Sequence, residues 1–166
     1  RLKMGKYVHY DVETDMTLVQ DNASICFSAT SADTYMMWAV NTFDVSQPVV
    51  RRHVYNAGNL TYNDTPIQGF TKADFIGKTH HIRIACETPY VRTYIDDKLV
   101  DTYVDASAVL SMGDVGFRVS ATGNEHEKAY FDNLEVTSYD AEGNGSVVLS
   151  EDFENPTGIF DNADVR

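Results

Sequence analysis

The sequence predicts an all-β fold, an antiparallel two-sheet sandwich of the jelly-roll kind. Roughly ten short segments alternate between apolar and polar side chains, which is the period of a strand with one buried face. Gly, Pro, Asn and Asp residues stand between these segments and predict tight turns. No segment sustains a helical period. Many short strands at regular spacing are typical of a β-sandwich.

The alternation is clearest in the first predicted strand, residues 7–19, where every second residue falls on one face. The next predicted strands are residues 23–29, 35–41, 49–56 and 60–62. Residues 63–78 are the least periodic part, because Pro and Gly residues interrupt them. We expect a long loop there, with one helical turn near residues 72–76.

The second half of the chain predicts a meander of consecutive antiparallel strands. These strands are residues 81–86, 90–95, 99–104, 114–120 and 129–136. Thr88-Pro89 and Asp96-Asp97 supply the first two turns. We expect the last two strands to continue the meander around a polar loop at residues 122–127.

A length of 166 residues predicts one domain with room for a core. We assign residues 1–138 to the sandwich domain, and residues 139–166 to a turn plus a C-terminal strand that completes the same sandwich. The alternative is that this tail opens a second module. The first interpretation is favoured, because the long first strand would otherwise leave an open sheet edge. The chain opens at Arg1 without an apolar leader, and we expect it to be a piece of a larger protein.

The formal net charge of −12 at pH 7 limits the partners. It would repel phosphate backbones and anionic lipid, so neither nucleic acid nor a membrane is an expected partner. Neutral ligands and cations remain. The ten tyrosines, eight phenylalanines and one tryptophan suit β-rich domains and sugar-binding surfaces. Cys26 and Cys86 each lie in a predicted strand, and the sequence leaves open whether they pair or stay buried thiols.

Three stretches of the second half carry a resemblance to a known family. They read HIRIACETPYVRTYIDDKLVDTYV, GDVGFRVS and KAYFDNLEVTS. These stretches resemble the concanavalin A-like, or laminin G-like, sandwich domains attached to bacterial glycoside hydrolases. Domains associated with alpha-L-rhamnosidases and the family 66 fructan-binding modules are the nearest kinds. The resemblance covers residues 10–138, and the chain departs from it at Asp97, where glycine is usual.

The resemblance implies a non-catalytic carbohydrate-binding module of a secreted modular glycoside hydrolase. Its ligand would be a neutral oligo- or polysaccharide on a concave sheet face, and its partner a catalytic domain in the same chain. The expected location is secreted, or at the cell surface or in the periplasm. Similar sandwiches include keto-disaccharide hydrolases, so an enzyme that uses Glu125, His126 and Glu127 is one alternative. A structural domain that packs against a catalytic neighbour is another.

Two adjacent predicted strands combine aromatic and hydrogen-bonding side chains, as a sugar-binding surface requires. Sugars present flat apolar faces to rings, and hydroxyls to donors and acceptors. The candidate ligand-binding residues are Tyr35, Trp38, Asn41, Arg52, His53, Tyr55, Arg118 and Glu127. The last two belong to the set if their strands line the same sheet. The alternatives stay open that Trp38 is a core residue and that Arg51 and Arg52 form a solvated face.

The sequence offers no clear pair of catalytic residues. Glycoside hydrolysis needs two carboxylates that face each other across the scissile bond. Glu13-Thr14-Asp15 is the nearest match to the Glu-x-Asp-x-(x)-Glu pattern of jelly-roll glucanases, but it lacks the third acid. Glu13 and Asp15 are expected on the solvent face of a strand. We therefore assign no catalytic residue.

A structural calcium ion is the one cofactor that the sequence suggests. Calcium takes oxygen ligands from carboxylates, amides and carbonyls. In the resembled domains an aspartate of the last strand often holds such an ion, and Asp132 of Phe131-Asp132-Asn133 matches that position. Asp152 is a second candidate ligand. The alternative is that these aspartates bond to nearby backbone.

Overall fold

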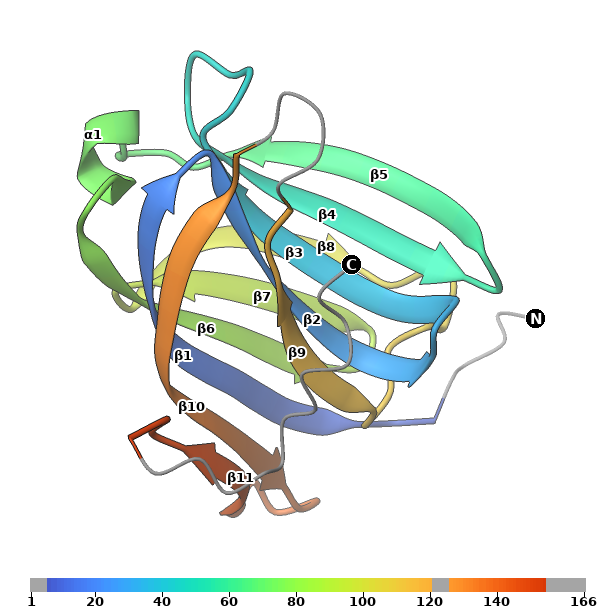
Figure 1. Cartoon of the computed structure of the whole chain (residues 1–166). Coiled ribbons are helices and arrows are strands. Elements are labelled where there is room, and N and C mark those ends of the chain that lie inside the picture. Colours follow the sequence, from blue (N-terminus) through green and yellow to red (C-terminus); the bar gives the residue numbers. More distant parts are fainter. Residues whose placement is uncertain (1–5, 121–125, 155–166) are drawn as a thin grey trace.

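Two antiparallel sheets pack face to face (Figure 1). The computed structural model describes residues 6–120 and 126–154. The six-stranded sheet comprises, in order, β11 (Gly145–Glu151), β10 (Lys128–Tyr139), β1 (His9–Gln20), β6 (Thr79–Glu87), β7 (Tyr90–Ile95) and β8 (Lys98–Val104). The five-stranded sheet comprises β5 (Asn59–Pro66), β4 (Val49–Asn56), β3 (Thr34–Asn41), β2 (Asn22–Ser31) and β9 (Asp114–Arg118). The predicted all-β sandwich is confirmed.

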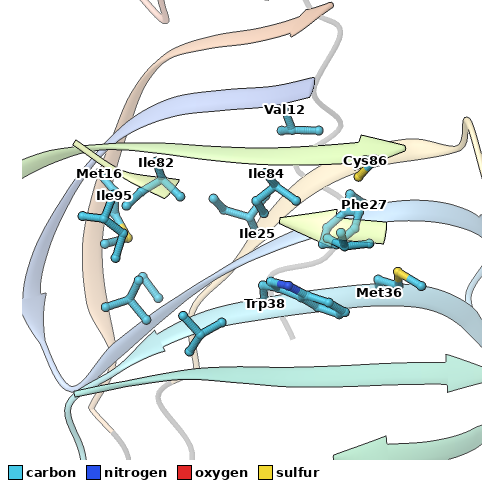
Figure 2. Packing of buried hydrophobic residues seen from close by; sticks show 14 of the residues in the cluster. Val12, Met16, Ile25, Phe27, Met36, Trp38, Ile82, Ile84, Cys86 and Ile95 are labelled. Carbon is cyan, nitrogen blue, oxygen red and sulfur yellow. The ribbon is translucent and has the colours of Figure 1, made fainter. Parts of the chain in front are cut away.

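The inner faces of both sheets meet in one apolar core (Figure 2). Alternate residues of a strand point inward, and from Val12 to Leu18 of β1 every second side chain is buried. Val12 and Ile84 of the six-stranded sheet and Phe27 and Met36 of the five-stranded sheet are all 0% exposed. Burial of these faces is the main stabilising contribution to the fold.

The meander comprises only β6, β7 and β8, and its second turn uses the residues expected. Asp96 and Asp97 form a two-residue hairpin turn between Ile95 and Lys98, which are partners in the ladder. Their φ angles are 49° and 65°, so both have the left-handed backbone that a type I′ turn requires. Aspartate tolerates this backbone better than most residues. This is why Asp97 can stand where glycine is usual.

The expectation that two further strands continue the meander is wrong. β9 pairs with β2 at the edge of the five-stranded sheet, whereas β10 lies between β1 and β11 in the six-stranded sheet. The two strands therefore face each other across the core. Phe117 of β9 stacks on Phe131 of β10, with 4.0 Å between ring centroids. This contact between the layers replaces the expected hairpin.

The segment between β4 and the meander contains more strand than predicted, together with the predicted helical turn. β5 extends to Pro66, four residues beyond the predicted end at Tyr62, so part of the expected loop is strand. Helix α1 (Lys72–Phe75) forms the expected helical turn. No helix among the described residues is long and apolar enough to cross a membrane. β11 pairs with β10 and forms the outer edge of the six-stranded sheet, and residues 155–166 of the predicted tail lie outside the described part of the chain.

Candidate functional site

A hollow lies on the outer face of the five-stranded sheet, and the strand register explains it. One row of side chains runs across all five strands, from Arg118 through Ser24, Ala39 and Arg51 to Asp64. The two middle positions carry small side chains and the flanking positions carry arginines. A row of large, small, small and large residues leaves space above its centre. A cavity of about 210 Å³ occupies this place.

Aromatic rings form one side of this outer-face hollow. Tyr35 and Tyr55 are directly opposite each other on β3 and β4, and their rings stack with centroids 4.5 Å apart. His53 lies one pleat further along β4, and its ring centroid is 5.3 Å from that of Tyr62. Burial raises the pKa of Tyr35 to about 12, so its hydroxyl stays protonated at neutral pH. The hydroxyl can then both donate and accept hydrogen bonds.

The polar groups of the hollow are partly fixed and partly unsatisfied. Arg51 donates two hydrogen bonds to the Asp64 carboxylate, at 2.9 and 3.0 Å, which hold its guanidinium in place. Burial, and then the positive charges of Arg51 and Arg118, lower the pKa of His53, so its ring is neutral at pH 7. Its buried Nδ1 and the buried Oδ1 of Asn22 have no hydrogen-bond partner among the described residues.

Two of the buried polar atoms that lack a partner within residues 6–120 and 126–154 belong to residues that line this cavity. Four others in the same part of the chain belong to Trp38, Arg52, Thr93 and Asp101, away from this cavity. A buried donor or acceptor without a partner costs about 1–3 kcal/mol. Asn22 and His53 therefore keep unused hydrogen-bonding capacity beside the hollow.

Glu127 closes the hollow on the side of β9. Its backbone N–H donates to the carbonyl of Ser120 at 2.9 Å, and its carboxylate accepts a hydrogen bond from the backbone N–H of Ser120. These contacts position an acidic side chain, 7% exposed, next to Arg118 in the lining of the cavity. Arg118 of β9 and Glu127, which precedes β10 of the other sheet, therefore both line this hollow.

The structure brings most, but not all, of the predicted ligand-binding residues together. Tyr35, His53, Tyr55, Arg118 and Glu127 line the outer-face hollow. Asn41 lies on the same face but is fully buried: its Oδ1 accepts a hydrogen bond from Asn22 and its Nδ2 donates one to the carbonyl of Phe43. Asn41 supports the end of the hollow and is not part of its lining.

Trp38 and Arg52 lie on the inner face of the sheet, which corrects the expectation that they share a surface with the other candidates. Trp38 is 3% exposed and packs edge-on against Phe27 and Tyr103. Arg52 is its direct partner in the ladder. The Arg52 guanidinium lies over the Tyr103 ring at 5.2 Å, and its Nη1 is 3.7 Å from Asp101 Oδ1. Both side chains therefore bridge the two sheets.

The mistake arose from treating consecutive strand residues as one set. Successive side chains of a strand point to opposite faces, so His53 cannot share a face with Arg52. The same rule places Arg51 with His53 and Tyr55, and Arg51 is the residue that the prediction missed. Asn22 and Ser24 were also missed, because nothing in the sequence shows that β2 lies beside β3.

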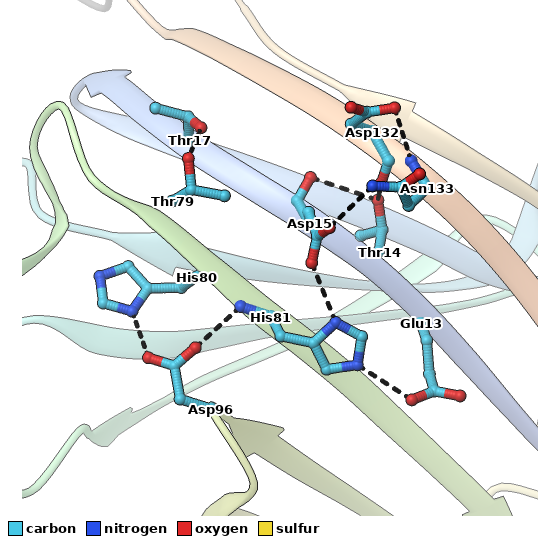
Figure 3. A network of polar contacts seen from close by, with 10 residues as sticks. All are labelled: Glu13, Thr14, Asp15, Thr17, Thr79, His80, His81, Asp96, Asp132 and Asn133. Carbon is cyan, nitrogen blue, oxygen red and sulfur yellow. Dashed lines mark hydrogen bonds and ion pairs between the residues drawn. The ribbon is translucent and has the colours of Figure 1, made fainter. Parts of the chain in front are cut away.

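Glu13 and Asp15, the nearest match to a catalytic carboxylate pair, bind a histidine on the outer face of the other sheet (Figure 3). His81 Nε2 lies 2.9 Å from Glu13 Oε1, and His81 Nδ1 lies 3.0 Å from Asp15 Oδ1. Asn133 Nδ2 donates to the second oxygen of Asp15 at 2.9 Å. The imidazole lies between the two carboxylates, where a substrate bond would have to lie. This arrangement stabilises the strand pair β1–β6.

The residues proposed for calcium do not form a ligand set. Asp132 accepts a hydrogen bond from the backbone N–H of Asn133, and Asp152 accepts one from that of Glu154. Within residues 6–120 and 126–154 no group of three or more His, Cys, Asp or Glu side chains could hold a metal ion. Calcium binding stays a prediction from the resemblance. Cys26 and Cys86 are both free thiols, the first partly exposed and the second buried.

The fold is an antiparallel β-sandwich of a six-stranded and a five-stranded sheet. No protein-family model and no curated protein matches the chain. Among solved structures, the carbohydrate-binding module CBM66 from Bacillus subtilis matches with a TM-score of 0.57 at 20% identity, over 78% of this chain and 74% of that one. Sheep galectin-11 matches with a TM-score of 0.58 at 9% identity, over 78% and 90% of the two chains.

A galectin from Caenorhabditis elegans is similar in the same way, with a TM-score of 0.55 and 9% identity over 82% of this chain and 87% of that one. At such low identities these likenesses show the fold alone. The site residues must therefore be judged on their own geometry.

The Arg52–Asp101 contact predicts a stability effect at a residue first considered for binding. The side chain of Asp101 is 2% exposed, and burial raises its pKa even though the charge of Arg52 opposes that shift. Arg52→Ala leaves this carboxylate without its counter-ion, so we expect the free energy of unfolding to fall by about 3 kcal/mol. Arg51→Ala, which breaks a pair on the outer face, should cost about 1 kcal/mol or less. Urea unfolding measures both, and equal losses would contradict the assignment of the two faces.

The His81 contacts predict a pH dependence of stability. Partial burial lowers the pKa of His81, but the hydrogen bonds with Glu13 and Asp15 outweigh it and raise the pKa above 6.5. The protonated imidazole is thus favoured in the folded state. Its full contribution to the free energy of unfolding is present below the pKa of His81 in the unfolded chain, and it is lost as the pH rises through the pKa of His81 in the folded protein. The stability difference between wild type and His81→Gln should therefore shrink in urea unfolding as the pH rises above about 6.5. A difference that grows with pH would contradict the pairing.

Proposed function

We propose that this chain is a non-catalytic carbohydrate-binding domain, and that its binding site is the outer-face hollow of the five-stranded sheet. The observation that carries the proposal is a stacked tyrosine pair beside arginine, histidine and asparagine side chains in the lining of one cavity. A sugar ring can lie against the Tyr35–Tyr55 wall through its apolar face. Its hydroxyls then reach His53, Asn22 and the arginines.

The charges of the hollow favour a neutral glycan. Arg51 is neutralised by Asp64, and Glu127 lies in the lining beside Arg118. The site therefore has little net charge, although the whole chain carries −12. The negative field of the chain does not oppose the approach of a neutral ligand, whereas it would repel an acidic polymer before that polymer reached the site.

The wider setting of the domain follows from the resemblance. We propose that it is an accessory module of a secreted modular glycoside hydrolase and lies in the same chain as the catalytic domain. Such a module raises the effective concentration of the catalytic domain at the polymer, so a weak site is sufficient. The similarity to the Bacillus subtilis carbohydrate-binding module supports this setting through the fold.

Removal of one stacked ring tests the site directly. Tyr55→Ala should weaken glycan binding about tenfold or more, because it removes half of the aromatic wall and about 1.4 kcal/mol of contact. Affinity electrophoresis in gels that contain fructan, galactan, xylan or β-glucan measures the effect. Tyr130→Ala is the matched control, because Tyr130 is 60% exposed on β10 and lies outside the hollow.

Two results would overturn the proposal. If Tyr55→Ala, shown to be folded by circular dichroism, binds as tightly as wild type, the hollow is not the site. If wild type binds none of the polysaccharides, the domain more closely fits a structural role beside a catalytic neighbour.

A further inference from the structure

A second hollow lies on the outer face of the six-stranded sheet, and it repeats the construction of the first. Here the row that crosses the strands runs from Asp11 through Ala85 to Arg92. Ala85 is the small residue in the middle, and charged side chains flank it. A cavity of about 320 Å³ lies over this row, larger than the one on the five-stranded sheet.

Stacked rings and cations form the walls of this second hollow. His9 of β1 stacks on Tyr139 of β10, with centroids 4.5 Å apart. On the other side the Arg83 guanidinium lies over the ring of Tyr94 at 3.9 Å. Stacks of this kind restrict the side chains before any ligand arrives, so binding costs less conformational entropy.

The lining of the second hollow includes the largely buried carboxylate of Asp11. Asp11 is 6% exposed, and its Oδ2 accepts hydrogen bonds from the Tyr139 hydroxyl at 3.1 Å and from Arg83 Nη1 at 3.4 Å. No donor from the described residues bonds to its Oδ1. This oxygen therefore has unused capacity to accept a hydrogen bond.

The charges of the second hollow select the class of ligand. The carboxylates of Asp11 and Glu87 oppose the guanidinium groups of Arg83 and Arg92, so the lining is close to neutral. It contains both donors and acceptors beside aromatic rings. Such a lining suits a neutral molecule with many hydroxyl groups, and it offers neither a net positive site for an anion nor an apolar groove for a peptide.

We propose that the second hollow is a second glycan-binding site, so that the domain holds two glycan chains at once. The choice of a glycan as ligand rests on the proposed function, whereas the hollow itself does not. The two sites lie on opposite outer faces with the whole core between them, so a single sugar residue cannot occupy both. Two sites on one rigid domain link neighbouring chains and increase the retention on a polymer.

Single-site variants test this proposal. Arg92→Ala removes a guanidinium from the second hollow, and Ala85→Gln fills its floor. Tyr55→Ala weakens the first site. Titration calorimetry with an oligosaccharide from the polysaccharide that wild type binds best should give two sites for wild type, and only one site with wild-type affinity for each variant. Chemical-shift mapping of backbone amides should show changes on β3–β4 and on β6–β7 in wild type.

The outcomes separate the two proposals. Changes confined to β3–β4 with one site in wild type would overturn the second site and leave the first. Changes confined to β6–β7 would support the second hollow and overturn the first. If a folded Arg92→Ala and a folded Ala85→Gln both keep two sites, the second hollow is not a binding site. If wild type binds no oligosaccharide, both proposals fail.

Discussion

The burial of one face of each sheet is the constraint on which the rest of this structure depends. Tyr10, Val12 and the other inward-facing residues exclude water from the space between the two sheets. The ladders between neighbouring strands satisfy the hydrogen bonds of the backbone. Once these two demands are met, the side chains of the outer faces are free to differ from row to row. The same alternation that stabilises the core therefore also creates two surfaces that can acquire a function.

Each hollow depends on the register of the strands rather than on a loop. Ser24 and Ala39 form one floor and Ala85 the other, because larger side chains flank them in their rows. A shift of one strand by one residue would turn the outward side chains of that strand toward the core and break the row. Sites built in this way are rigid, because core packing fixes the backbone beneath them. Rigidity matters for sugar binding, which gains little free energy from each contact.

The sequence predicted the strands well because a period of two is a local property. The predicted strand at 49–56 has the bounds of β4, and the first strand differs at its ends by one or two residues. Pairings between distant strands were not predictable in this way. The sheet that β9 joins, and the neighbours of β10, depend on contacts such as Phe117 with Phe131 that no local pattern encodes. The prediction of the candidate site had the same weakness. Trp38 and Arg52 have side chains suited to sugar binding, but they lie on the inner face of the five-stranded sheet.

The two outer faces share one pattern of charge, with arginines and carboxylates together in each hollow. A chain with a net charge of −12 would be expected to present acidic faces throughout, yet arginines occur in both hollows. The guanidinium groups of Arg51, Arg83 and Arg92 are matched by carboxylates or lie over aromatic rings, so they act as positioned hydrogen-bond donors more than as free positive charges. Lysine would supply charge without this fixed geometry. If the two hollows bind glycans as proposed, arginine suits these rows because recognition of hydroxyl groups depends more on the direction of each donor than on its charge.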